Sequence, residues 1–297
     1  MKKKIIIVTG GAGFVGSNLI SLLIKKTKYK IISIDNYSSG NKKNHIKHKN
    51  IKYIKGDTRN ISLILQKYKK RIKTIFHFGE FARIYQSFLK FNKCIESNSI
   101  GTHEVFNFCL QNKIKLIYSA TSATLGNKGK DKDLSPYAFS KAKNLELLEN
   151  LNKWFNMKFE IIYFYNVYGP KQICRGNMAT VIGIFEDHYY HNHPLPVVKP
   201  GTQSRRFTHI NDTVGACYYA WKKNKCRHYS VTNKKSYKII EVARLFKHKI
   251  KLLPARKGER FASALSTMNL SNKVYRIYGK IMLKDYINDF IKTKKAK

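Results

Sequence analysis

The chain has 297 residues, 43% of them hydrophobic, so it can bury a large core. One large or two interleaved domains are expected, and a disordered chain is not. The formal net charge of +41 comes from 58 basic and 17 acidic side chains scattered over nearly every segment, which indicates a diffusely basic surface that favours anionic substrates. Because no run approaches the roughly 18 apolar residues of a membrane span and no secretory leader is evident, a cytoplasmic location is expected.

Apolar runs and helical stretches alternate along the first half of the chain. The opening "KKKIIIVTG" predicts a strand buried on both faces, and "FVGSNLISLLIKK" after it has helical spacing. Further strands are expected at 30–35, 51–57, 73–79, 115–121 and 159–169, most of them separated by helical stretches such as 61–71 and 101–113. This alternation predicts an α/β fold of the Rossmann class, a doubly wound parallel sheet.

The pattern changes after Pro170 to shorter elements, and "NHPLPVVKPG" alone holds three of the six prolines. We therefore expect a first domain over residues 1–165 and a smaller C-terminal α/β lobe over 166–297, interleaved with the first.

A glycine-rich loop lies between the first strand and the first helix. In "TGGAGFVGS", Gly10, Gly13 and Gly16 are three residues apart. Such glycines permit a tight turn, close approach of the backbone to a pyrophosphate and close packing of helix on strand, with the helix N-terminus facing the anion. Asp35 ends the second strand about 20 residues on. A carboxylate there can accept both ribose hydroxyls and would repel a 2′-phosphate, which predicts NAD in preference to NADP.

Neighbours of these residues are expected in the same dinucleotide site: Phe14, Val15, Asn36 and Thr58. Asp57, which ends the third strand, is either a contact to the adenine edge or the N-cap of a helix beginning near Arg59. The sequence leaves both roles open.

The stretch "SPYAFSK" has Ser135 as a good N-cap and Pro136 as a good first helical residue, so a helix is predicted to start here. Tyr137 and Lys141 then share one face. The ammonium could stabilise the phenolate and lower the pKa of the tyrosine toward working pH, so that it acts as a general base. Taken alone, Y-x-x-x-K is more often a solvated helix face, but here it follows a dinucleotide loop and a hydroxyl-bearing strand end, "YSATSATLG".

The combination of the glycine loop, Thr121, Tyr137 and Lys141 resembles the extended short-chain dehydrogenase/reductase family, the NAD-dependent nucleotide-sugar epimerases and dehydratases, over almost the whole chain. The resemblance implies that Thr121 holds the sugar hydroxyl, Tyr137 takes its proton and Lys141 binds the nicotinamide ribose. A hydride would pass from the sugar C4 to NAD. It also implies that residues 1–165 bind NAD and that 166–297 bind the nucleotide sugar.

Further segments match family motifs: "FHFGE", "NSIGT", "YFYNVYGP", "GTQSRRFTHINDTV" and "ARKGERF". By this resemblance we expect additional cofactor contacts from Phe78, Gly79 and Asn98. Substrate contacts are expected from Asn166, Arg205, Arg256 and Thr121, and Asp212 is expected to be a structural acid.

The segment "GEFAR" carries Glu80 and Arg83 where small residues usually lie in the family. Together with Ser87 they are expected in the substrate site and could set an unusual sugar preference. A surface ion pair between Glu80 and Arg83 is equally open.

The residues after Thr121 are Ser122 and Ala123, where the 4,6-dehydratases carry an acid pair and the decarboxylating members a glutamate. Dehydration is therefore disfavoured, and we favour an NAD-dependent nucleotide-sugar 4-epimerase resembling the UDP-glucose 4-epimerases, with a UDP-sugar as substrate. A 4-dehydrogenase or ketoreductase of the same fold is the alternative. A non-catalytic basic protein that binds polyanions is a third hypothesis, which no RNA-binding motif supports.

Relatives implied by the resemblance pair through two helices, here roughly 84–111 and 137–155, so a homodimer is expected. The five cysteines are odd in number and lack a C-x-x-C, so neither a disulfide framework nor a zinc site is predicted. No H-x-x-x-H pairs with an acid, and no metal is expected. Neither a nucleic acid nor a membrane is expected as a partner.

Overall fold

Six apolar runs between residues 5 and 164 form strands in one sheet of the computed structural model, which describes residues 3–255 and 274–295. These strands are β1 (Ile5–Thr9), β2 (Lys30–Asp35), β3 (Ile51–Lys55), β4 (Ile72–His77), β5 (Lys115–Thr121) and β6 (Phe159–Phe164). Two strands from the C-terminal half, β11 (His228–Thr232) and β14 (Val274–Tyr278), complete the order β14-β11-β6-β5-β4-β1-β2-β3. Every neighbouring pair is parallel, so the predicted Rossmann sheet is confirmed.

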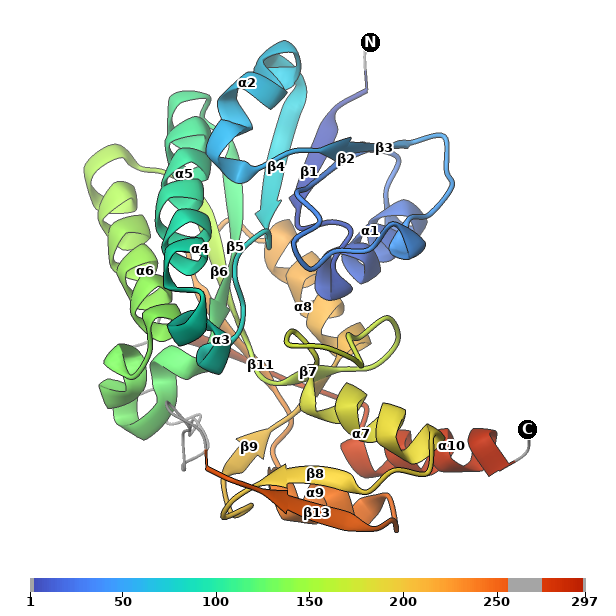
Figure 1. Ribbon diagram of the computed structural model, residues 1–297. Helices are drawn as coiled ribbons and strands as arrows, with labels where there is room; N and C mark the ends of the chain where they lie inside the picture. Colours follow the sequence, from blue (N-terminus) through green and yellow to red (C-terminus); the bar gives the residue numbers. More distant parts are fainter. Residues whose placement is uncertain (1–2, 256–273, 296–297) are drawn as a thin grey trace.

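Helices cover both faces of this sheet (Figure 1). On one side lie α1 (Phe14–Lys26) and α8 (Ile210–Lys222), which pack against each other. The other side carries α2 (Ile61–Leu65), α5 (Thr102–Gln111) and α6 (Pro136–Phe155), with α3 (Ile84–Leu89) and α4 (Phe91–Ile95) packed on α6. The expected helix over 61–71 is α-helical only to Leu65 and continues as a 3₁₀ segment, Gln66–Arg71.

Strand β1 shows why both faces must be covered. Its side chains alternate, so that Ile5 and Ile7 pack into the core beneath α2, α5 and α6, while Ile6 and Val8 pack beneath α1 and α8. All four are at most 1% exposed. A continuous apolar run is what a strand buried on both faces requires.

The chain beyond residue 166 contributes to two bodies. Strand β11, strand β14 and helix α8 join the large sheet, whereas the remaining elements form a smaller lobe with its own apolar cluster. These elements are β7 (Val167–Tyr168), α7 (Val181–Tyr190), β8 (Leu195–Val198), β9 (Ser204–Arg206), β10 (Thr208–His209), β12 (Ser236–Lys238), α9 (Ile239–Leu245), β13 (Ile250–Leu253) and α10 (Leu283–Lys295). The lobe lies below the carboxyl ends of the sheet strands in Figure 1.

The strand order reverses between β1 and β4, because β2 and β3 continue to one side of β1 while β4, β5 and β6 lie on the other. In open α/β sheets, the crevice outside the carboxyl ends of the strands at this reversal binds the ligand. The fold therefore places the binding site between the sheet and the small lobe. None of the helices in the described ranges has the length and apolar character that crossing a membrane would require.

Candidate active site

A cavity of about 450 Å³ opens at the strand reversal. The ends of β1 to β6 line it on one side, and the lobe segment 173–182 lies on the other. Most of the predicted site residues line this cavity: Gly10, Gly13, Phe14, Val15, Gly16, Asp35, Asn36, Thr58, Phe78, Gly79, Glu80, Arg83, Thr121, Tyr137, Lys141, Asn166 and Arg205. Its volume lies in the usual range for ligand sites.

The glycine loop forms a tight cradle at the start of α1. Gly10 has φ +67°, and a Cβ there would lie 2.7 Å from the carbonyl oxygen of Phe78. A Cβ on Gly16 would lie 2.2 Å from the carbonyl oxygen of Gly10. Since side chains are excluded at both positions, the backbone turns sharply and the helix N-terminus faces the open cavity, which fits the pyrophosphate of NAD.

Asp35 lies at the end of β2, beside the glycine loop. Its Oδ2 accepts a hydrogen bond from the backbone N–H of Ala12 at 2.9 Å, and its Oδ1 accepts from that of Tyr37 at 2.8 Å. Burial raises the pKa of this carboxyl, and the two N–H donors oppose that effect. Each carboxylate oxygen keeps a second lone pair for a ribose hydroxyl.

For Asp57, the structure shows the capping role. Its Oδ1 accepts from the backbone N–H of Arg59 at 3.0 Å, at the start of a 3₁₀ segment, and its Oδ2 accepts from Asn36 Nδ2 at 3.1 Å. Asp57 is absent from the cavity wall, whereas its neighbours Thr58 and Asn36 are part of it.

Thr121, Tyr137 and Lys141 reach the cavity from β5 and α6. Helix α6 begins as predicted, with Pro136 in its first turn and Ser135 Oγ accepting from the N–H of Ala138 at 3.1 Å. The hydroxyl oxygen of Thr121 accepts from the N–H of Ala123 at 3.2 Å, so its own proton is available to a ligand.

Ser87 and Asn98 lie behind the cavity wall and are absent from its lining. Ser87 Oγ accepts from the N–H of Tyr137 at 3.3 Å, so it supports the start of α6. Asn98 is fully buried, and its amide pairs with both backbone groups of Phe81, at 2.7 Å and 2.9 Å. Ser87 and Asn98, predicted as ligand contacts, thus hold in place Tyr137 and Phe81, which line the cavity.

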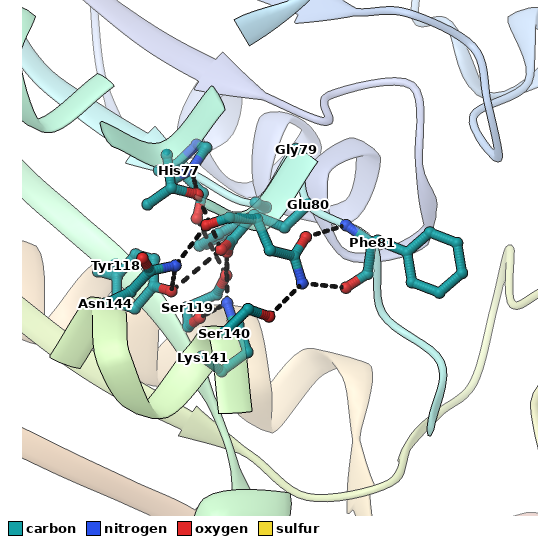
Figure 2. A network of polar contacts seen from close by, with 12 residues as sticks. His77, Gly79, Glu80, Phe81, Tyr118, Ser119, Ser140, Lys141 and Asn144 are labelled. Carbon is teal, nitrogen blue, oxygen red and sulfur yellow. Dashed lines mark hydrogen bonds and ion pairs between the residues drawn. The ribbon is translucent and has the colours of Figure 1, made fainter. Parts of the chain in front are cut away.

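Within the part of the chain that the structure describes, Glu80 and Arg83 form no ion pair with each other. Glu80 forms a buried ion pair with Lys141 (Figure 2). Arg83 donates from Nε to the carbonyl oxygen of Met178 at 3.1 Å, and its Nη2 donates to the same oxygen. The surface ion pair left open by the sequence is therefore not formed, and Arg83 instead joins the end of β4 to the lobe.

On the lobe side, Asn166 donates from Nδ2 to the carbonyl oxygen of Arg206 at 2.8 Å and has φ +34°. Arg205 is 8% exposed and lies on β9. Asp212 is a structural acid as expected, because its Oδ2 accepts from the N–H groups of Lys280 and Ile281 at 2.9 Å and 3.0 Å. The predicted contact Arg256 lies outside the described residues.

The lobe segment 173–182 was not predicted to contribute to the site. Six of its residues line the cavity: Ile173, Met178, Ala179, Thr180, Val181 and Ile182. The available signal was its position between "YFYNVYGP" and a helix whose N-cap, Thr180, accepts from the N–H of Gly183 at 3.0 Å. The motif follows the carboxyl end of β6, and a capped helix start soon after it is expected near the carboxyl ends of the sheet strands.

Comparison with known proteins agrees with this geometry. The model of the "NAD dependent epimerase/dehydratase family" matches residues 6–233. The putative UDP-glucose 4-epimerase of Methanocaldococcus jannaschii is 29% identical over 285 residues, which cover 92% of this chain and 88% of that protein.

Two solved structures share the fold over the full length. The UDP-N-acetylglucosamine 4-epimerase of Methanobrevibacter ruminantium, in complex with UDP-N-acetylmuramic acid, has a TM-score of 0.84 at 26% identity and covers 99% of this chain and 98% of its own. The Thermus thermophilus UDP-glucose 4-epimerase, in complex with NAD, has a TM-score of 0.84 at 20% identity, with 98% and 99% covered. The chain therefore belongs to the NAD-dependent epimerase/dehydratase family, whose cofactor is NAD.

Proposed function

We propose that this protein is an NAD-dependent nucleotide-sugar 4-epimerase acting on a UDP-sugar. The observation that carries the proposal is that Thr121, Tyr137 and Lys141 line one cavity with the glycine loop and Asp35. Proton removal and dinucleotide binding thus occur in the same enclosed space. Membership in an enzyme family also favours this function over polyanion binding.

The three side chains have complementary duties in the proposed reaction. Tyr137 takes the proton of the sugar C4 hydroxyl and later returns it, while Thr121 donates a hydrogen bond to that oxygen. Lys141 is buried beside them and supplies the positive charge that favours the phenolate. NAD held by the glycine loop and Asp35 would accept the C4 hydride and return it to the opposite face of the ketone, which would invert C4.

The acids around the cavity favour epimerisation over dehydration. Of the described lining residues, Asp35 and Glu80 are the only carboxylic acids. Asp35 lies at the dinucleotide end, and Glu80 is paired with Lys141. After Thr121 come Ser122 and Ala123, so no free acid is available there to eliminate water. Similarity to a putative UDP-glucose 4-epimerase and to a UDP-N-acetylglucosamine 4-epimerase supports a UDP-sugar as substrate.

The test is incubation of the pure protein with UDP-glucose, UDP-N-acetylglucosamine and GDP-sugars, followed by separation of the C4 epimers. We expect interconversion of at least one UDP-sugar without net release of NADH. Stoichiometric NADH and a ketosugar would instead establish the dehydrogenase alternative, and no reaction with any of them would reject the proposal for these substrates. Mass spectrometry of ligands retained through purification identifies the coenzyme and substrate class independently.

We further propose a homodimer formed through the helices on the α6 side of the sheet. Large apolar side chains are exposed there, namely Leu89 (62%), Phe91 (54%), Ile100 (50%) and Phe139 (44%). Their elements pack together, since α3 and α4 both contact α6.

A proposed cytoplasmic location is supported by the thiols, because all five cysteines are free.

Replacing Phe91 and Ile100 together by aspartate is expected to convert the dimer to a monomer, because burying two carboxylates at an apolar interface is unfavourable. Sedimentation velocity measures the change. The control is Leu252→Asp, which places one carboxylate on a similarly exposed residue (50%) of β13 in the lobe and should leave the dimer intact. A native protein that sediments as a monomer would contradict the proposed assembly.

A further inference from the structure

The carboxylate of Glu80 is buried at the centre of a polar network in the cavity wall (Figure 2). Its Oε1 accepts from Tyr118 Oη and from Thr102 Oγ1, both at 3.0 Å, and its Oε2 accepts from Lys141 Nζ. The side chains of Glu80 and Lys141 are only 3% and 4% exposed. The carboxylate therefore accepts hydrogen bonds from three protein donors, with at least one on each oxygen.

A chain of hydrogen bonds fixes the direction of these donors. Thr9 Oγ1 accepts from the N–H groups of Phe78 and Gly79, at 3.1 Å and 3.0 Å, so its own proton is directed to His77 Nδ1 at 2.8 Å. His77 therefore carries its proton on Nε2 and donates it to Thr102 Oγ1 at 3.0 Å. Thr102 in turn can only donate to Glu80. The chain thus ends on a negatively charged acceptor.

Lys141 is held by the same arrangement. Its ammonium donates to Glu80 Oε2 and to the carbonyl oxygen of Ser119, and it lies 4.4 Å from the ring centroid of Tyr118. A lysine has three N–H donors, so one remains for the cavity that Lys141 and Tyr137 both line.

Three other titratable groups interact with this pair: His77 on β4, Tyr118 on β5 and Cys94 on α4. Tyr137 on α6 interacts with Tyr118, and Arg83, at the N-cap of α3, interacts with Tyr137. Burial lowers the pKa of His77 to about 4 and raises that of Cys94 to about 11. Burial also raises the pKa of Tyr118. Near neutral pH these three are uncharged, so Glu80 is the negative charge that faces Lys141.

We infer that Glu80 is a positioning residue that fixes the ammonium of Lys141 and, through it, sets the pH range in which Tyr137 acts as a base. The inference rests on the proposed function, in which Tyr137 is that base. It differs from the substrate contact expected from the sequence, because both oxygens of Glu80 are already occupied by protein donors.

The negative charge of Glu80 favours the protonated form of both Lys141 and Tyr137. Burial lowers the pKa of Lys141, and the adjacent carboxylate opposes this and keeps the ammonium charged. The same negative charge offsets part of the positive field that Lys141 exerts at the phenol. Removing the charge of Glu80 should therefore let both Tyr137 and Lys141 lose their protons at lower pH. The whole active pH range should move toward acid.

The experiment is a spectrophotometric titration of tyrosinate in NAD-loaded protein. Each variant is compared with the same variant carrying Tyr137→Phe, so that the difference reports Tyr137. The variants are Glu80→Gln, which removes the charge at nearly constant shape, and Glu80→Asp, which keeps it. If the glutamine variant does not fold, Glu80→Ser removes the same charge and leaves room for water.

The matched control is Glu160→Gln. Glu160 is also fully buried and paired with a lysine, Lys115, at 3.2 Å, but it lies on β6 outside the cavity. This variant should lose thermal stability and keep the native titration.

We expect Glu80→Gln to lower the midpoint of the Tyr137 tyrosinate titration by about half a pH unit or more. Both limbs of the profile of turnover against pH should move in the same direction. Glu80→Asp should titrate close to the native protein. An unchanged or raised midpoint in Glu80→Gln, or an equal shift in Glu160→Gln, would overturn the inference. Because the titration needs no sugar substrate, it decides the role of Glu80 even if no epimerase activity is found.

Discussion

Replacing Tyr137 by phenylalanine is expected to slow C4 interconversion by about three orders of magnitude, which is the scale of a lost general base. The substitution removes one hydroxyl and leaves the ring, so the start of α6 and the wall of the cavity should persist. Without the phenolate, nothing in the described wall is placed to take the C4 proton, since Thr121 is a donor and Glu80 is bound to Lys141. NAD binding should be nearly unchanged.

The measurement is kcat of the purified variant for the UDP-sugar that the native protein interconverts, together with its NAD content. Tyr190→Phe, at a tyrosine on α7 that is 60% exposed and outside the cavity lining, is the matched control and should turn over at the native rate. Native turnover by the Tyr137 variant would reject the proposed base. Loss of bound NAD would instead indicate a structural role for the hydroxyl.

The parts of the fold that depend on local pattern were predictable from the sequence. The strand at Ile5–Thr9 follows from an uninterrupted apolar run, and α6 begins where Ser135 and Pro136 supply a cap and a first turn. The glycine loop was predictable because Gly10 and Gly16 occupy positions where a side chain would clash with the backbone, and the glycines themselves are visible in the sequence. In each case a few consecutive residues contain the whole physical reason.

The contribution of the C-terminal half to the large sheet, through β11, was harder to predict from the sequence. Strand β11 is five residues long and includes His228 and Ser230, which lack the apolar character of the N-terminal strands. Its place beside β6 depends on pairing between residues about 65 apart in the sequence, such as the hydrogen bond between Tyr163 Oη and His228 Nδ1 at 3.0 Å. Such a contact is specified by tertiary packing and leaves no local signature.

The role of Glu80 illustrates the same limit within the site. The sequence showed only an acid where small residues usually lie, three residues from an arginine. Its actual partners are Lys141, 61 residues away, and Tyr118, 38 residues away, brought together at the ends of β4 and β5 beneath α6. The nearby arginine was the natural candidate from spacing, but Arg83 points to Met178 in the lobe. The identity of a buried counter-ion is decided by topology.

Replacing Gly16 by alanine is expected to weaken NAD binding by about a hundredfold, or roughly 3 kcal/mol. A Cβ at this position would lie 2.2 Å from the carbonyl oxygen of Gly10 and 2.8 Å from Cα of Gly11. Both obstacles are backbone, so the methyl group can be accommodated only if α1 moves away from the turn. That movement displaces the loop that faces the pyrophosphate, and the overpacking should also cost about 1–3 kcal/mol of folding stability.

Gly215→Ala separates this steric effect from the general consequence of adding a methyl group to a helical glycine. Gly215 lies in α8, and a Cβ there meets nothing within 4 Å, so alanine should raise stability by up to about 1 kcal/mol and leave NAD binding unchanged. Calorimetric titration of NAD-free protein with NAD measures the affinity, and thermal unfolding measures the stability. Native affinity in the Gly16 variant would show that the helix N-terminus tolerates displacement, and the pyrophosphate would then have to be held by other parts of the cavity.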